Sequence, residues 1–130
     1  MHLRSFFLAA LLLTACRPGA PAGPVVVTPA DRAEAAQLYR ARCASCHGVE
    51  GAGDGVAGRS LVPPPRSFRE VAWQKAVTDT RIEQVILVGG APWGLSPLMP
   101  ANPDLGDRRA VLAALREQVR AFGHSDIVGP

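Results

Sequence analysis

The chain has 130 residues, 48% hydrophobic but only 5% aromatic, which predicts one globular domain whose core is short of large side chains. A bound apolar cofactor would fill such a core. The formal net charge of +3 comes from arginines spread along the chain with acids between them, so this pattern argues against nucleic-acid binding.

The first segment is typical of an export signal. Arg4 gives it a positive start, and residues 6–15 are apolar except for Thr14, a run too short to span a membrane. The run ends in Leu-Thr-Ala-Cys at residues 13–16, which resembles the bacterial lipobox, whose cysteine is lipidated and becomes the mature N-terminus. We therefore predict a signal peptide over residues 1–15 and a lipid on Cys16. The alternative is ordinary cleavage that leaves Cys16 as a free thiol.

Further along the chain, the pattern predicts an all-α domain. Residues 16–30 are rich in Pro, Gly and Ala and predict a tether, which places the domain at residues 31–130. Two glycine- and proline-rich loops are expected, at residues 48–66 and 91–104. No segment alternates like a strand. The first predicted helix runs from Asp31 to Cys43 with Asp31 as cap. Two shorter helices start at capping boxes: one runs from Ser67 to Lys75 with a Ser67/Glu70 box, and one from Thr80 to Gly89 with a Thr80/Glu83 box. The last helix runs from Asp107 to Phe122 and has its apolar positions at Leu112, Leu115, Val119 and Phe122.

The pattern Cys43-Ala44-Ser45-Cys46-His47 is the C-x-x-C-H signature of covalent haem attachment. Cysteines three apart at a helix end share one face and can add to the two vinyl groups on one edge of a porphyrin. His47 would then bind the iron as proximal ligand. We therefore predict one covalent haem c as the cofactor.

Three other interpretations of this pattern compete. A thioredoxin-like C-x-x-C would follow a strand, but here a helix precedes the pattern and a glycine-rich loop follows it. A zinc site would need a second pair of ligands, and the remaining histidines are His2, in the predicted signal, and His124. A disulfide between Cys43 and Cys46 would leave His47 without a role.

From about Asp31 to Phe122 the chain resembles the class I c-type cytochromes, specifically the small bacterial monohaem ones. The resemblance lies in L-Y-x-x-x-C-x-x-C-H-G at residues 38–48, in S-P-L-M-P at residues 96–100, and in the amphipathic last helix. It implies three to five helices wrapped around one haem. One departure is Ala35, where the family usually has glycine, which predicts a slightly wider crossing of the first and last helices.

The sixth iron ligand decides between two functions. Met99 is the one methionine left after signal removal and lies in a proline-bounded loop, so we predict that it is the distal ligand. A space-filling role for Met99 and ligation by His124 are the alternatives. His/Met ligation predicts an electron carrier and not an enzyme. An open sixth position would predict a haem enzyme or ligand sensor, for instance a peroxidase.

The resemblance also implies supporting residues and a setting. A backbone carbonyl in the loop after the motif would orient His47, with Pro63 as the candidate. Trp93 and Arg66 are candidates for hydrogen bonds to the haem propionates, and the alternatives are a packing role for Trp93 and a solvated side chain for Arg66. We expect a monomeric domain on the periplasmic side of a bacterial membrane, held by its lipid anchor and exchanging electrons with redox protein partners. Arg17 after the lipidated cysteine favours the outer membrane.

Overall fold

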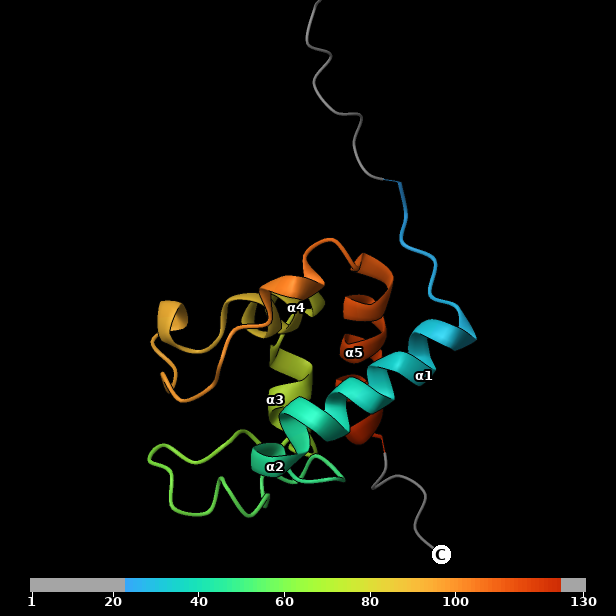
Figure 1. Ribbon diagram of the computed structural model, residues 1–130. Helices are drawn as coiled ribbons and strands as arrows, with labels where there is room; N and C mark the ends of the chain where they lie inside the picture. The colour runs from blue at the N-terminus through green and yellow to red at the C-terminus, as the bar shows by residue number, and fades with distance from the viewer. Residues whose placement is uncertain (1–22, 125–130) are drawn as a thin grey trace, which may run out of the picture.

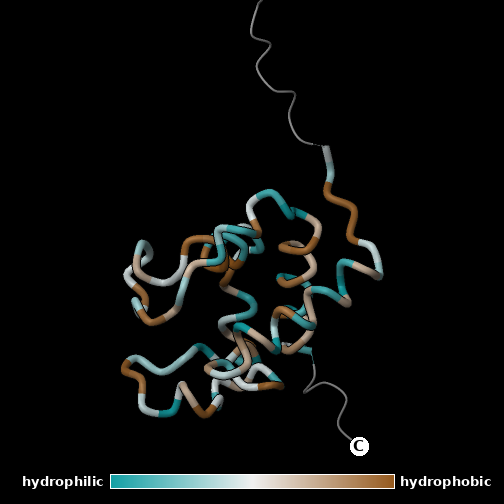
Figure 2. Tube along the Cα trace, in the orientation of Figure 1, coloured by the Kyte–Doolittle hydropathy of each residue, from teal (hydrophilic) through white to brown (hydrophobic). Residues whose placement is uncertain are grey.

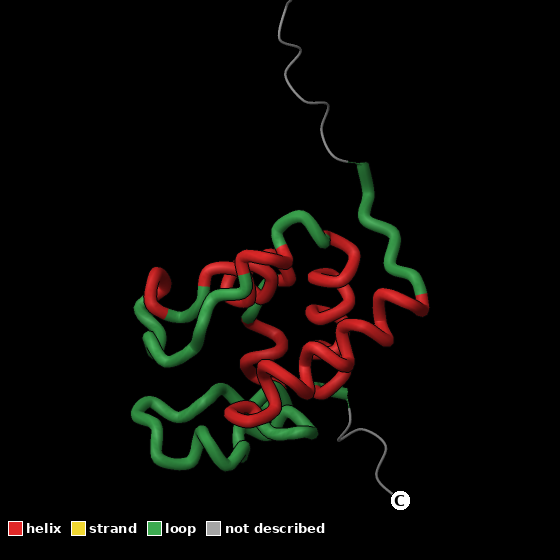
Figure 3. The backbone as a smooth tube through the Cα atoms, in the orientation of Figure 1, coloured by secondary structure: helices red, strands yellow, loops and turns green. Residues whose placement is uncertain are grey.

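The computed structural model describes residues 23–124, which form helices joined by loops without any strand (Figures 1 and 3). The predicted signal peptide, residues 1–15, and the predicted lipidation site, Cys16, lie outside the described residues. Within residues 23–124, no helix has the length and apolar character needed to cross a membrane. The prediction of a small all-α fold is confirmed.

Helix α5 (Arg109–Phe122) supplies most of the core, and helix α1 (Pro29–Leu38) crosses it (Figure 1). Every apolar position predicted for the last helix is buried, with 3–9% of each side chain exposed: Leu112, Leu115, Val119 and Phe122. Ala35 lies on the buried face of α1 with 1% exposed. The spacing of these small and large residues therefore fixes the central helix pair, although α5 begins two residues later than the predicted Asp107.

Helix α1 begins at Pro29, two residues before the predicted start at Asp31. Thr28 is the cap: its hydroxyl accepts from the Asp31 backbone N–H at 3.2 Å, and the Asp31 carboxylate accepts from the Thr28 N–H at 2.8 Å. The prediction of Asp31 as cap was wrong, because the two residues form a reciprocal capping box in which Asp31 is the third helical residue. Residues 28–30, predicted as the end of the tether, therefore belong to the first helix and its cap.

The segment that carries the cysteines continues this helix. It passes through a π-helical turn, η1 (Tyr39–Cys43), closed by the Ala44 N–H donating to the Tyr39 carbonyl, and ends in the short helix α2 (Ala44–His47). The Tyr39 side chain is 2% exposed, its ring lies 5.1 Å from that of Phe122, and its hydroxyl donates to the Gly48 carbonyl at 2.8 Å. Burial raises the pKa of Tyr39, so the hydroxyl keeps the proton that it donates. Tyr39 thereby ties the end of the motif to the core.

Two further helices, α3 (Val71–Ala76) and α4 (Asp79–Val88), begin at positions other than those predicted. The Ser67/Glu70 box does not form, because the Glu70 carboxylate accepts from Arg66 instead and α3 starts after Glu70. Thr78, and not Thr80, caps α4 by accepting from the Arg81 N–H at 3.1 Å. The predicted end of α4 is confirmed, since Gly89 terminates it with a φ of 77°.

The two predicted loops lie at one side of the molecule, away from the α1–α5 crossing (Figures 1 and 2). The second loop contains two short 3₁₀ turns, η2 (Ala91–Trp93) and η3 (Pro103–Leu105). Both loops carry exposed apolar side chains, including Val62 with 93% and Leu98 with 63% of the side chain exposed. Apolar side chains at this density on one side indicate that the loops enclose something apolar.

Candidate functional site

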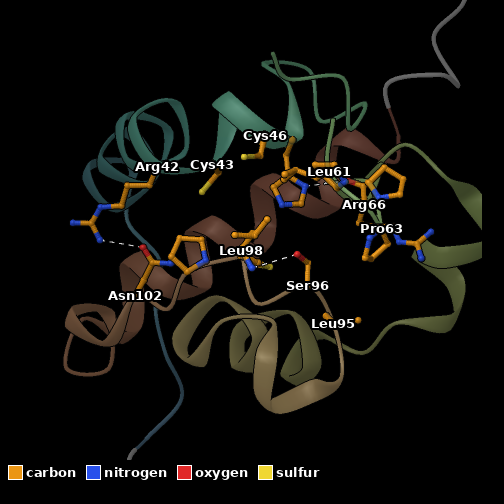
Figure 4. Close-up of a pocket in the computed structure, with 15 residues that line it drawn as sticks. Arg42, Cys43, Cys46, Leu61, Pro63, Arg66, Leu95, Ser96, Leu98 and Asn102 are labelled. Atoms are coloured by element: carbon orange, nitrogen blue, oxygen red, sulfur yellow. Dashed lines mark hydrogen bonds between the residues drawn. The ribbon is translucent and has the colours of Figure 1, made fainter. Parts of the chain in front are cut away.

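A cavity of about 300 Å³ opens between the two loops, and all four predicted haem ligands and attachment residues are among those that line it. Figure 4 shows Cys43 and Cys46 on one side of this cavity and Leu98 of the second loop on the other. Cys43, Cys46 and His47 line the first side, together with the first loop. Met99 lines the second side within the second loop. Most of the other lining residues are apolar: Leu61, Pro63, Pro64, Pro65, Leu95, Leu98 and Pro100. The structure thus brings together four residues that are up to 56 positions apart in the sequence.

The two motif cysteines are free thiols on the cavity wall. Cys43 ends η1 and Cys46 lies in α2, so both project from the same short helical segment (Figure 4). Burial raises the pKa of Cys43 to about 11, so this thiol is protonated at neutral pH. The disulfide interpretation is not what the structure adopts, and both sulfur atoms remain available for thioether bonds.

His47 has the geometry of a metal ligand held by its other nitrogen. Its Nδ1 lies 3.0 Å from the Arg66 carbonyl, and since a carbonyl oxygen accepts, Nδ1 carries the proton. Burial lowers the pKa of the imidazole, so the ring is neutral near pH 7 and Nε2 keeps a lone pair. Phe68 stacks on the ring with centroids 4.5 Å apart. Tautomer and orientation are therefore both set for binding through Nε2.

The carbonyl that orients His47 belongs to Arg66, so the assignment of this role to Pro63 was wrong. The reason is a contact between two parts of the first loop: the Phe68 N–H donates to the Gly51 carbonyl at 2.7 Å. This bond places residues 66–68 beside the chain that leaves His47, and the Arg66 carbonyl is the one that contacts the His47 ring. A carbonyl in the predicted loop does orient the ring, but from three residues further along.

The loop that carries Met99 is fixed to the end of α4. The Gly90 N–H donates to the Met99 carbonyl at 3.0 Å, and the Met99 N–H donates to the Ser96 carbonyl at 3.2 Å. A Cβ on Gly89 would lie 2.7 Å from the Met99 carbonyl oxygen, so the loop approaches the helix end at a place where only glycine leaves room. The backbone of Met99 is thus held on the cavity wall opposite His47.

The other predicted site residues differ in their placement. Arg66 lines the cavity, but its guanidinium pairs with Glu70 at 2.5 Å. Trp93 is not among the lining residues, and the Arg81 guanidinium lies 3.7 Å above its ring. The structure therefore does not bring Trp93 to the cavity. His124 is exposed, with its Nδ1 2.9 Å from the Arg120 carbonyl, and it also lies outside the lining.

Sequence reasoning missed two polar residues of the cavity, Arg42 and Asn102. The signal for Arg42 was its place directly before Cys43, on the same helical turn. Asn102 stands between two proline-containing turns without a pattern of its own. The stacking of Phe68 on His47 also had no sequence signal, because 21 positions separate the two rings.

The donor set and the shape fit a covalently attached haem. Two thiols from one helix face, a neutral imidazole beside them and a thioether opposite are the groups that such a cofactor requires, and the wall between them is mostly apolar. A zinc site does not fit, since no three His, Cys, Asp or Glu side chains among the described residues are arranged so that they could hold a metal ion.

Comparison with protein families agrees with this geometry. A family model described as cytochrome c oxidase, cbb3-type, subunit III matches residues 30–114, which is more than half of the chain. The match includes the motif, both loops and the start of α5. Comparison with curated proteins found no match.

Proposed function

Because the chain belongs to the family of c-type cytochrome domains described as cytochrome c oxidase, cbb3-type, subunit III, we propose that it is a lipid-anchored electron carrier with His47 and Met99 as axial ligands. The family binds haem c covalently and uses it in electron transfer, which confirms the predicted cofactor and the resemblance to class I c-type cytochromes. The axial pair, the anchor, the compartment and the partners are the parts that we propose.

The observation that supports the proposal is the occurrence of four sulfur and imidazole side chains around one cavity. Cys43 and Cys46 would hold the haem through thioether bonds, and His47 would bind its iron through Nε2. Met99 lines the opposite wall, and its backbone is fixed by Gly90. When bound, the haem supplies a one-electron cycle between Fe(II) and Fe(III).

The protein's own contribution to electron transfer is to keep both axial positions filled and the surroundings dry. The Arg66 carbonyl accepts a hydrogen bond from the Nδ1–H of His47 and so increases the basicity of the ring. A thioether is a soft ligand that favours Fe(II), and an apolar wall raises the cost of the extra charge on Fe(III). The thioether and the apolar wall would each raise the reduction potential relative to that of a haem in water.

We propose the periplasmic side of a bacterial membrane as the location, by the export signal and by lipidation of Cys16. A tether of about twelve residues between Cys16 and Thr28 would let the domain sample roughly 20 Å of membrane surface, where it would meet redox protein partners. Arg17 favours the outer membrane. The domain would act as a monomer in this role, and the alternative of an enzyme with an open sixth position is decided by the experiment below.

The test is the variant Met99→Ala in the holoprotein. We expect loss of the far-red ferric band that sulfur ligation produces and a reduction potential lower by more than about 59 mV, a tenfold change in the ferrous to ferric ratio. Leu98→Ala is the matched control, because Leu98 lines the same cavity without a sulfur atom. It should keep the far-red band. A wild-type protein with a high-spin ferric spectrum would instead support the enzyme or sensor.

A further inference from the structure

Arg42 connects the two walls of the haem cavity. It immediately precedes Cys43 in η1, on the wall that carries the proximal ligand. Its Nη1 donates to both carboxylate oxygens of Asp104, at 2.9 and 3.0 Å, and lies 3.3 Å from the Asn102 side-chain oxygen. Both acceptors belong to the segment that follows Met99 on the other wall. Figure 4 shows the bond from Arg42 to Asn102 at one end of the cavity.

Asn102 is in turn fixed to the end of α4, where the Met99 loop begins. Its backbone N–H donates to the carbonyls of Ile86 and Leu87, each at 3.1 Å, and its side-chain amide donates to the Ile86 carbonyl at 3.1 Å. These carbonyls lack partners within the helix, so Asn102 caps α4 from outside. Arg42 therefore contacts the same rigid unit of helix end and loop that holds Met99.

Besides the contacts of Arg42, the packing of helices against α5 sets the distance between the two cavity walls. Helices α1 and α4 each pack against α5, so the core fixes the walls at their inner ends. The hydrogen bonds of Arg42 add a direct link between the two walls, from η1 to the segment at Asn102 and Asp104. This link joins the residue directly before Cys43 to the segment directly after Met99, so it bears on the spacing between His47 and Met99.

We propose that Arg42 is a positioning residue that, through Asp104 and Asn102, holds the Met99 loop where Met99 would act as a ligand of the haem iron. The proposal rests on the proposed axial role of Met99. Breaking the contact leaves the thioether bonds and His47 in place but allows the Met99 loop to move outward more often. An added ligand for the iron then competes with Met99 more successfully.

The exposure of the Arg42–Asp104 pair sets how much its loss should change the affinity for an added ligand. Its side chains are 40% and 46% exposed, so solvent screens the attraction. A pair of this kind shifts an equilibrium by about two- to fivefold, and we expect that increase in the apparent affinity of the ferric protein for imidazole. The far-red band should remain at low imidazole concentration, because Met99 is still the preferred ligand.

The experiment titrates ferric holoprotein with imidazole in the variants Arg42→Gln, Asp104→Asn and the double variant. Each single variant should bind imidazole more tightly, and the effect of the double variant should be smaller than the sum of the two single effects, because both substitutions remove the Arg42–Asp104 pair. Arg32→Gln is the matched control: Arg32 pairs with Glu117 at 2.8 Å with similar exposure, but between α1 and α5 and away from the cavity. It should lower the unfolding midpoint without changing imidazole affinity.

The outcomes distinguish a failure of Met99 as ligand from a failure of Arg42 as positioning residue. Absence of the far-red band in the wild type would remove the axial role of Met99 and with it the basis of this proposal. A normal wild-type band, with imidazole affinities in Arg42→Gln and Asp104→Asn equal to that of Arg32→Gln, would overturn the role of Arg42 alone. If Arg42→Gln impairs haem attachment because of its position beside Cys43, Asp104→Asn decides the question from the opposite wall.

Discussion

Gly89→Ala provides a strong test of how the Met99 loop is held. Gly89 ends α4 with φ 77° and ψ −174°, a region that is essentially restricted to glycine. An added Cβ would also meet the Met99 carbonyl oxygen at 2.7 Å, whereas ordinary contact begins at 3.4 Å, so this oxygen must retreat by about 0.7 Å. The substitution therefore combines backbone strain with displacement of the residue that we propose as ligand.

Gly94→Ala separates these two contributions. Gly94 also has a positive φ, 67° with ψ 19°, but nothing lies within 4 Å of the position that its Cβ would take. This control should cost about 1 kcal/mol of stability through strain alone. Gly89→Ala should cost about 2–3 kcal/mol, since strain and displacement add. Both losses are smaller than the usual stability of about 5–15 kcal/mol, so both variants should fold.

The assay measures guanidinium unfolding and imidazole affinity on the same two holoproteins. We expect Gly94→Ala to lose stability with unchanged imidazole affinity, and Gly89→Ala to lose more stability and to bind imidazole more tightly. The reasoning fails if the two variants bind imidazole equally, because the close approach of Gly89 to Met99 would then have no influence on the iron.

Three further predictions concern attachment, anchoring and pH. Replacing Cys43 and Cys46 together by Ala should abolish haem staining after denaturing electrophoresis, and persistent staining would contradict thioether attachment. Cys16→Ser should move the protein from the membrane to the soluble periplasmic fraction with its visible spectrum intact, since stable anchoring requires more than one acyl chain and lipidated Cys16 would supply them. Hydrogen bonds from Thr28 lower the pKa of Asp31, so its charged form stabilises the fold above about pH 4 and this contribution is lost as the pH falls through the lowered value. The difference in unfolding midpoint between wild type and Asp31→Asn should accordingly be present at pH 7 and disappear in acid, and a constant difference would contradict the capping role.

The parts of the fold that sequence could predict are those set by neighbours in the chain. The buried face of α5 follows from residues three and four apart, and the end of α4 follows from Gly89. The helix starts were harder, because two capping residues often compete. Asp79 follows Thr78, and Glu83 stands three residues after Thr80, so both threonines are possible caps. The extended backbone of Thr78 allows its hydroxyl to accept from the Arg81 N–H.

The same distinction applies to the candidate site. The motif at residues 43–47 is contiguous, so its place at the end of the first helical segment could be predicted from spacing. The carbonyl that orients His47 could not, because the bond from Phe68 to Gly51 decides which residue of a long loop faces the ring. Trp93 illustrates the same limit. Its ring contacts the guanidinium of Arg81 in α4, and no local sequence pattern distinguishes a tryptophan with such a partner from one that contacts the cofactor.

The two sides of the cavity also differ in how firmly they are held, and this difference has a functional meaning. On the proximal side, His47 is fixed within a helix that Tyr39 ties to the core, with a carbonyl and an aromatic ring orienting its imidazole. On the side that we propose as distal, the Met99 backbone is fixed by loop hydrogen bonds, and an exposed ion pair joins Arg42 to Asp104 in the segment that follows Met99. Since an exposed pair contributes at most about 1 kcal/mol, we expect substitutions at Arg42 and Asp104 to change the proposed ligation by Met99 in small steps while the proposed attachment on the His47 side stays constant. The reduction potential of this domain should therefore be adjusted mainly through residues of the distal loop and its contacts.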